Sequence, residues 1–128
     1  MTKQQHILFL VSGMQGGGAE RVASILSNYW VEKGYRVTLM PTFSGRGECI
    51  YHLDERVELD FLADKVISNT WSILNRLHRF WALRKLIFQA KPDIIVSFLT
   101  HVNVAAILCA LGSNIPVIVS ERTYPPKY

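Results

Sequence analysis

The chain has 128 residues, of which 49% are hydrophobic and 19% are charged, and its formal net charge is +4 at pH 7. This length suits one domain with its own core and is too short for a TIM barrel of about 250 residues. The apolar content is ordinary, which argues against a disordered chain. The modest positive charge is compatible with a phosphate-bearing substrate or an anionic membrane and requires neither.

The cysteines and the apolar runs bear on the cellular compartment. Cys109 lies in an apolar run and is expected to be a buried thiol. Cys49 lies far from it in the sequence, in a polar segment that contains glycines. No Cys-x-x-Cys motif is present, so we expect no metal site and a reducing compartment. No apolar run reaches the length of a signal peptide core or a membrane span, which predicts a cytoplasmic protein. The chain stops at Tyr128 soon after a predicted strand, which we interpret as the edge of a fragment.

The first half of the chain predicts a strand, a helix and a second strand. Ile7–Val11 is a continuous apolar run of the kind found in buried parallel strands. A helix is expected from Ala19, with an apolar face at helical spacing, and Lys33–Gly34 should end it with a left-handed glycine. Residues 35–40 read as a second strand, which Pro41 should stop.

The middle of the chain predicts a loop over 42–56, an exposed strand over 57–62 and a long helix over 72–89. One side of this helix should be apolar and carry Leu74, Leu77, Phe80, Trp81, Ile87 and Phe88. The other side should be polar and carry Arg76, His78, Arg79, Lys85 and Gln89. Arg84 falls inside the apolar arc and interrupts the pattern.

The last third of the chain predicts a strand over 93–98, a helix over 103–111 that ends at Gly112, and a strand over 115–120. Strands that alternate with helices in this way indicate an α/β fold, here a doubly wound parallel sheet of about five strands. The default strand order for such a sheet is third, second, first, fourth, fifth.

Unusual segments follow three of the predicted strands. Ligands of doubly wound sheets bind outside the carboxyl ends of the strands, at the point where the strand order reverses. The candidate catalytic residue there is His101, as a general acid/base or as a hydrogen-bond donor to a sugar or phosphate. The candidate substrate- or phosphate-binding residues are Gly16, Gly17, Gly18, Glu20, Arg21, Ser120, Glu121 and Arg122.

Each of these features also has a structural interpretation. Glycines before a helix N-terminus suit a phosphate or a sugar oxygen, yet they also make a tight turn. His101 could be a solvated loop residue, Glu121–Arg122 a surface ion pair, and Glu20–Arg21 solvated residues of a first helical turn. A P-loop is excluded because Ala19–Glu20 stands where Lys-Ser/Thr is required. The dinucleotide fingerprint fails because Arg21 occupies the third glycine position.

The basic, aromatic helix has two interpretations. The favoured one is a core helix with a charged outer face. The alternative is a membrane contact through Arg76, Arg79 and Lys85, with these cations drawn to anionic headgroups. We expect no nucleic-acid partner, since none of the common binding motifs is present.

The runs Gly16–Val22 and Glu32–Leu39, together with Lys91–Phe98 and Ile115–Arg122, resemble the N-terminal domain of family 4 glycosyltransferases. The resemblance implies half of a GT-B fold, in which two Rossmann-like domains form a retaining transferase. The N-terminal domain mainly binds the acceptor, often a lipid-linked or growing polysaccharide, and the C-terminal domain binds the nucleotide-sugar donor. The resemblance also places Gly16, Gly17 and Gly18 in the cleft between the two domains, near the donor phosphates, and His101 near the sugar. It further implies that this domain docks on a membrane.

The resemblance also departs from the family pattern, because the donor-binding domain and its Glu-x7-Glu motif have no counterpart in these 128 residues. We therefore expect one acceptor-side domain over residues 1–128, inactive alone and without a cofactor of its own. The complete enzyme would use a nucleotide-sugar, at the inner face of the membrane. The alternative is a non-catalytic phosphate- or sugar-binding module, or one subunit of a split transferase.

Overall fold

The computed structural model describes residues 4–11, 18–42, 52–60, 62, 73–98 and 100–120. Side chains at 18–19, 73–76 and 100–101 lie outside this description, although the backbone there is helical. All structural statements below refer to this part of the chain.

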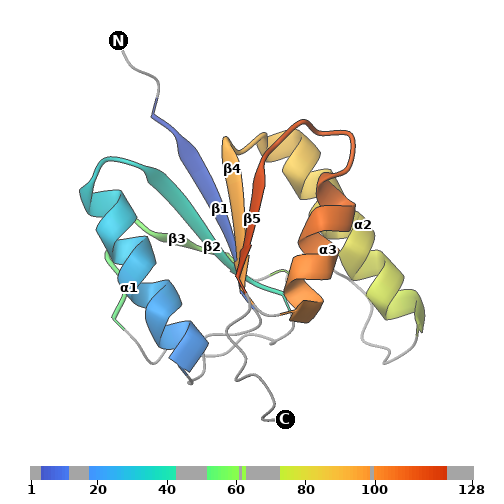
Figure 1. Cartoon of the computed structure of the whole chain (residues 1–128), viewed down its shortest axis with the longest axis horizontal. Helices are drawn as coiled ribbons and strands as arrows, with labels where there is room; N and C mark the ends of the chain where they lie inside the picture. The colour runs from blue at the N-terminus through green and yellow to red at the C-terminus, as the bar shows by residue number, and fades with distance from the viewer. Residues whose placement is uncertain are drawn as a thin grey trace, which may run out of the picture.

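The centre of the fold is a five-stranded parallel sheet (Figure 1). Its strands are β1 (His6–Val11), β2 (Arg36–Pro41), β3 (Glu58–Leu59), β4 (Ile94–Phe98) and β5 (Val117–Ser120). Their order is β3-β2-β1-β4-β5, and all four neighbouring pairs are parallel. The expected doubly wound order is therefore confirmed, with its reversal between β1 and β4.

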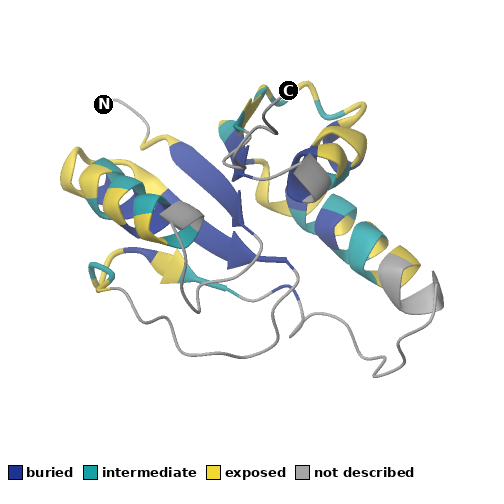
Figure 2. Cartoon of the chain, turned by 60° about the horizontal axis from the view of Figure 1, so that its bottom comes forward, coloured by how far each residue is buried: buried dark blue, intermediate teal, exposed yellow. Residues whose placement is uncertain are grey.

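Helices cover both faces of this sheet. α1 (Gly18–Glu32) lies on one face, and α2 (Ile73–Ala90) and α3 (Thr100–Ala110) lie together on the other (Figure 1). The alternation of β1 explains how two cores form from one strand. Phe9 and its odd-numbered neighbours pack with α1, whereas Leu8 and Leu10 pack with α2 and α3. Figure 2 shows the buried strands between helices whose outer sides are exposed.

Several predicted boundaries are corrected by the structure. Among the described residues of the predicted strand 57–62, the strand is shorter than predicted: β3 is Glu58–Leu59, which pairs with Thr38–Leu39 of β2, and the Asp60 N–H donates to the Leu39 carbonyl at 3.0 Å. Pro41 does not stop β2 but is its last residue, paired in register with Val11. α3 begins at Thr100, three residues before the predicted start. The glycine ends are confirmed, with φ of +98° at Gly34 and +83° at Gly112.

The predicted apolar side of α2 is partly wrong. Leu83 and Ile87 are buried against the sheet, with Phe80 and Leu86 packed beside them. Leu77, Trp81 and Phe88, assigned to the same inward side, are exposed. The apolar residues of α2 cover a wide arc, so different parts of the arc could face the sheet. In the structure the part with Leu83 and Ile87 faces the sheet, and the part with Trp81 faces outward.

Arg84 interrupts the apolar arc because it binds the neighbouring helix. Its Nη1 donates to the carbonyl oxygens of Leu108, Cys109 and Leu111, at 3.5, 3.4 and 3.1 Å. The last carbonyls of a helix have no partner within it and carry partial negative charge. The guanidinium of Arg84 therefore caps the C-terminal end of α3.

Cys109 is buried, as predicted, and burial raises the pKa of its thiol to about 11. Because the thiolate is the reactive form, Cys109 should react with an alkylating reagent at pH 8 only as fast as the protein opens. In a Cys49→Ser variant, labelling followed by mass spectrometry should be slow in buffer and fast in denaturing urea. Equal rates in the two conditions would show that the thiol is accessible in the folded protein.

Candidate functional site

The candidate site lies at the carboxyl edge of the sheet, beside the junction of β1 and β4. These strands pair from Ile7 with Ile94 to Leu10 with Ser97. β2 and β3 lie on the β1 side of this pair, and β5 lies on the β4 side. α1 follows β1 and α3 follows β4, so both helices begin at this edge of the sheet. Two helix N-termini, with their positive dipole ends, therefore lie at the same edge of the sheet, one on each face, beside the point where the strand order reverses.

Asn103 ties the two strands on the α3 side together. Its Oδ1 accepts a hydrogen bond of 2.6 Å from the Ser97 hydroxyl of β4, and its Nδ2 donates to the Ser120 carbonyl of β5 at 3.3 Å. Ser97 and Asn103 are both buried. The first turn of α3 is thus held in place relative to the ends of two strands. We assign Asn103 as a positioning residue for the segment that contains His101.

Thr42 connects the ends of β1 and β2. Its backbone N–H and its hydroxyl both donate to the Val11 carbonyl, at 2.8 and 3.0 Å. The Thr42 carbonyl in turn accepts a hydrogen bond of 3.2 Å from Nη1 of Arg79. Arg79 is half-buried and anchors α2 to the end of β2, so it is not merely part of a solvated outer face.

The sequence-predicted residues divide into those that the structure describes and those that it does not. Gly18, Glu20 and Arg21 form the first turn of α1, with Glu20 half-buried and Arg21 exposed. Ser120 ends β5, and its carbonyl binds Asn103. Lys85 is exposed on α2. Outside the described part lie Gly16, Gly17, Glu121, Arg122 and the side chains of His101 and Arg76.

Sequence reasoning assigned no role to Ser97, Asn103 or Thr42. A signal was present for the first two, because a serine interrupts the apolar run of β4 and an asparagine precedes the apolar run Val104–Ala110 of α3. Buried polar side chains of this kind need partners. Which partners they find depends on strand order and register.

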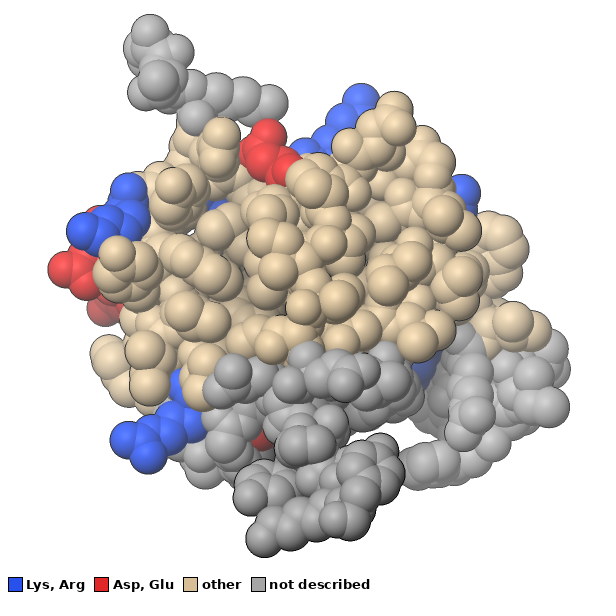
Figure 3. All heavy atoms as spheres, viewed as in Figure 1, with Lys and Arg blue, Asp and Glu red and all other residues tan. Residues whose placement is uncertain are grey.

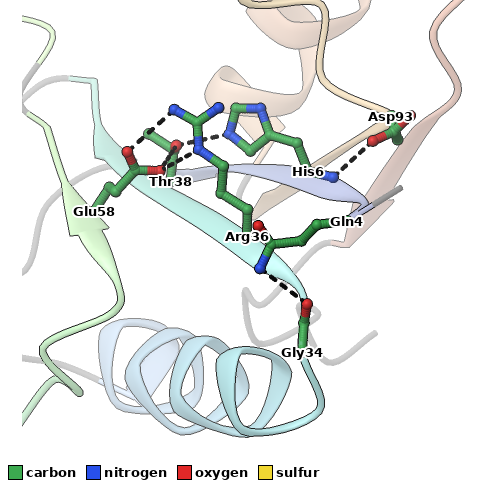
Figure 4. Close-up of polar contacts among 7 residues, drawn as sticks. All are labelled: Gln4, His6, Gly34, Arg36, Thr38, Glu58 and Asp93. Carbon is green, nitrogen blue, oxygen red and sulfur yellow. Dashed lines mark hydrogen bonds and ion pairs between the residues drawn. The ribbon is translucent and has the colours of Figure 1, made fainter. Parts of the chain in front are cut away.

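A second polar cluster lies at the amino edge of the sheet, at the opposite end from the candidate site (Figure 4). Arg36 forms a two-fold hydrogen-bonded ion pair with Glu58, at 2.8 and 3.1 Å. The Thr38 hydroxyl donates to Glu58 at 3.2 Å and lies 2.8 Å from Nε2 of the buried His6. The backbone N–H of His6 donates to Asp93 at 2.7 Å.

The hydrogen-bond pattern indicates the form of the His6 ring. The single hydroxyl proton of Thr38 goes to Glu58, which can only accept, so Nε2 of His6 must donate to Thr38. Nδ1 is then the unprotonated nitrogen, and it is buried with no hydrogen-bond partner among the described residues. Burial, assisted by the charge of Arg36, lowers the pKa of His6. His6 is therefore a neutral, structural histidine.

Acid should destabilise the fold through His6. Since the pKa of His6 is lowered from 6.5 in the folded state, the unfolded chain binds more protons below this pH. The contribution of His6 is complete above pH 6.5 and is lost as the pH falls through 6.5 towards the folded-state pKa. Urea unfolding at pH 7.5, 6.5 and 5.5 should show this loss, at about 1.4 kcal/mol per unit of pKa difference.

The matched variants for this pH effect are His6→Gln and His78→Gln. His6→Gln should flatten the pH dependence between 7.5 and 5.5, and His78→Gln, at an exposed position of α2, should keep it. The lowered pKa of Glu58 acts below its ordinary value of 4.5, outside this window. If the free energy of unfolding of His6→Gln depends on pH as steeply as that of the wild type, His6 is not the group responsible for the loss of stability in acid.

A parallel sheet with α1 on one face, α2 and α3 on the other, and two helix N-termini at its reversal point defines a Rossmann-like domain, such as forms half of a GT-B fold. Comparison with known proteins agrees with this class. The family described as Glycosyltransferase Family 4 matches residues 16–128. The chain therefore belongs to glycosyltransferase family 4.

A curated relative from Campylobacter jejuni is 31% identical over 118 residues. It is the "GalNAc-alpha-(1->4)-GalNAc-alpha-(1->3)-diNAcBac-PP-undecaprenol alpha-1,4-N-acetyl-D-galactosaminyltransferase". The similarity covers 91% of this chain and 32% of the relative. The chain thus spans about a third of the length of this transferase. In the described part of the chain, no helix is long and apolar enough to cross a bilayer.

Proposed function

We propose that these 128 residues are the acceptor-side part of a retaining glycosyltransferase. The complete enzyme would transfer a sugar from a nucleotide-sugar to a lipid-linked or polysaccharide acceptor, at the inner face of the membrane. The observation that carries the proposal is that α1 and α3 both begin at the carboxyl edge, after the paired strands β1 and β4 where the strand order reverses, in a chain of this family. The lipid-linked diphosphate in the name of the Campylobacter relative supports this acceptor class.

The chemistry of this edge suits an anionic substrate. The N–H groups of the α1 and α3 first turns would donate to phosphate or sugar oxygens, and Arg21 would add a positive charge. Gly16, Gly17 and Gly18 would let the backbone approach the ligand closely, and His101, in the first turn of α3, would contact the sugar. Ser120, Glu121 and Arg122 would extend the site, with Glu20 beside the glycines.

The donor would bind to polypeptide outside these residues, so the isolated chain should transfer no sugar. Its binding of acceptor can still be measured by amide chemical shifts, with a short-chain polyprenyl diphosphate as the probe. Shifts should concentrate at residues 18–21 and 100–103 and spare the amino edge around His6. Shifts confined to the amino edge, or robust transfer from a nucleotide-sugar by the isolated chain, would contradict the proposal.

Matched arginine variants sharpen this experiment. Arg21→Gln should weaken binding of the diphosphate roughly threefold, because it removes one charge beside the α1 N-terminus. Arg56→Gln removes an exposed arginine that forms an ion pair with Asp54 in the segment just before β3. This variant should leave binding of the diphosphate unchanged. An equal loss in both variants would indicate a general charge effect without a site.

The exposed side of α2 supports membrane docking. Trp81 and Leu77 lie on this side at 60% and 48% exposure, near the exposed Lys85. An aromatic residue beside cations on a helix surface suits a lipid headgroup layer. Arg76 and Arg79 would add positive charge, although Arg79 also anchors α2 to Thr42.

Binding to vesicles of phosphatidylethanolamine and phosphatidylglycerol tests the docking surface. Trp81→Ser and Lys85→Gln should each reduce binding, and added salt should reduce it further. Tyr29→Ser, which removes an equally exposed aromatic ring on the other face of the molecule, is the control and should bind as the wild type. Binding that responds to neither substitution would leave α2 as an ordinary core helix.

The alternative is a non-catalytic phosphate- or sugar-binding module, or one subunit of a split transferase. The site at the carboxyl edge suits these two alternatives as well as the acceptor-side part of a single transferase chain. Transfer that appears when a separately expressed donor-binding chain is added would select the split enzyme. Binding of the diphosphate together with a lack of transfer in every such mixture would select the binding module.

A further inference from the structure

The outer side of α1 carries a short apolar stretch between two opposite charges. Ile25 and Tyr29 lie one turn apart and are 57% and 53% exposed. Arg21 precedes them by one turn, Glu32 follows them by about one turn, and both are exposed. At this spacing the four residues share one side of the helix, opposite the buried Ser27. They are called the α1 seam below.

The fold itself leaves the α1 seam uncovered. The core contacts of α1 come from its inner side, and Asn28 holds residues 52–54 at its flank. Within the described ranges, neither Arg21 nor Glu32 takes part in an ion pair. Figure 2 shows the outer side of α1 exposed. At the left of Figure 3, where α1 lies, charged side chains gather near the two ends of the helix and uncharged side chains lie between them.

The order of charges along the seam is its own complement when the helix is reversed. A helix rises about 1.5 Å per residue, so Arg21 and Glu32 lie about 16 Å apart along the axis. If a second α1 packs antiparallel about a two-fold axis at the level of residues 26–27, Arg21 of each copy faces Glu32 of the other. Ile25 and Tyr29 of both copies then meet near this axis. Parallel pairing would place like charges side by side, so the charges select the antiparallel arrangement.

The same charges argue against a lipid surface at this place. Membrane-surface helices combine apolar residues with cations, whereas Glu32 stands at one end of the seam, where anionic headgroups would repel it. The seam also lies on the face of the sheet opposite α2, which carries the proposed docking surface. A surface with both signs of charge around an apolar centre suits a protein partner.

We propose that the α1 seam binds a second copy of this chain and forms a symmetric, antiparallel helix pair. Two apolar side chains per copy bury little area compared with the roughly 1,200 Å² of specific, stable interfaces, so we expect a weak dimer with a Kd of about 100 µM. Arg21 is also a candidate ligand of the acceptor diphosphate, and the second copy would compete for its side chain. The pairing does not depend on the proposed transfer reaction, so either can fail without the other.

Sedimentation equilibrium of the 128-residue chain, from about 10 to 500 µM, tests the pairing. Glu32→Arg should raise the Kd about tenfold, because in a symmetric pair it replaces two attractions by two repulsions. Arg21→Glu should do the same. The variant with both substitutions restores opposite charges and should return the Kd to within about threefold of the wild type. This variant also suits the dipole of α1, with an acid near the N-terminus and a cation near the C-terminus, so it should fold.

An apolar substitution and a matched control complete the experiment. Ile25→Ser should weaken the dimer about fivefold and leave the urea midpoint of the dilute monomer unchanged, because Ile25 is already exposed there. Trp81→Ser, at an equally exposed position on the opposite face, should leave the Kd unchanged.

Three results would overturn the proposal. The first is a chain that stays monomeric at about 500 µM. The second is a folded double variant whose Kd stays as weak as that of the single charge variants. The third is a dimer that Ile107→Ser on α3 disrupts and the charge variants do not, because another exposed apolar surface would then hold the second copy.

Discussion

Replacing Phe9 by alanine should destabilise this domain by about 3–5 kcal/mol, as expected for removal of a fully buried aromatic ring. Phe9 is 0% exposed in the central strand β1. Its ring lies 4.8 Å from that of Phe98 in an edge-to-face arrangement and 5.4 Å from that of Trp30. Domains of this size are stable by about 5–15 kcal/mol, so the substitution would remove much of the total.

Urea unfolding followed by tryptophan fluorescence measures this loss, because Trp30 reports on the packing around Phe9. Tyr29→Ala is the matched control, since this aromatic residue is 53% exposed on α1 and should change stability by less than about 0.5 kcal/mol. A Phe9→Ala protein with a stability within 1 kcal/mol of the wild type would show that α1 does not pack on β1 as described.

Replacing Asn103 by alanine should cost about 1–3 kcal/mol, because it leaves the buried Ser97 hydroxyl without its acceptor and removes the donor to the half-buried Ser120 carbonyl. The Ser97 hydroxyl loses its acceptor, and the Ser120 carbonyl loses the donor at 3.3 Å. The first turn of α3 would also lose its connection to β4 and β5. We therefore expect weaker binding of the polyprenyl diphosphate probe in addition to lower stability.

A double-mutant cycle isolates the hydrogen bond between Ser97 and Asn103. The loss in Ser97→Ala with Asn103→Ala should be smaller than the sum of the two single losses, because no hydroxyl is then left without an acceptor. Asn28→Ala is the control, since Asn28 also makes two hydrogen bonds, to the backbone of His52 and Asp54, but lies far from the carboxyl edge. It should leave diphosphate binding unchanged. Additive losses at 97 and 103 would contradict the pair.

The positions of most elements could be predicted from the sequence because each carries a local signal. Ile7–Val11 reads as a buried strand from its continuous apolar run, and Gly34 and Gly112 mark helix ends that require a positive φ. The start of α3 could not be predicted, because Thr100 and His101 carry no strong helix signal.

The orientation of α2 shows where local patterns stop being informative. Its apolar residues extend over a wide arc, and either part of that arc satisfies a helical periodicity. Contact with Leu8 and Leu10 selected Leu83 and Ile87 for the core and left Trp81 outside. Arg84 interrupts the apolar pattern of α2, and only the tertiary structure explains it, because its guanidinium donates to carbonyl oxygens at the end of α3.

By itself the sequence determined the α/β class, the order of elements and the family, because apolar periodicity, glycine ends and short motifs are properties of contiguous residues. Only the tertiary structure decided which polar residues meet. Ser97, Asn103 and Ser120 come from β4, α3 and β5, and His6, Thr38 and Glu58 come from three strands. It also showed that β5, predicted only as a strand, is the last strand on the β4 side of the sheet in the described part of the chain. The physical reason is that strand order and register are set by packing between distant segments, which no local pattern encodes.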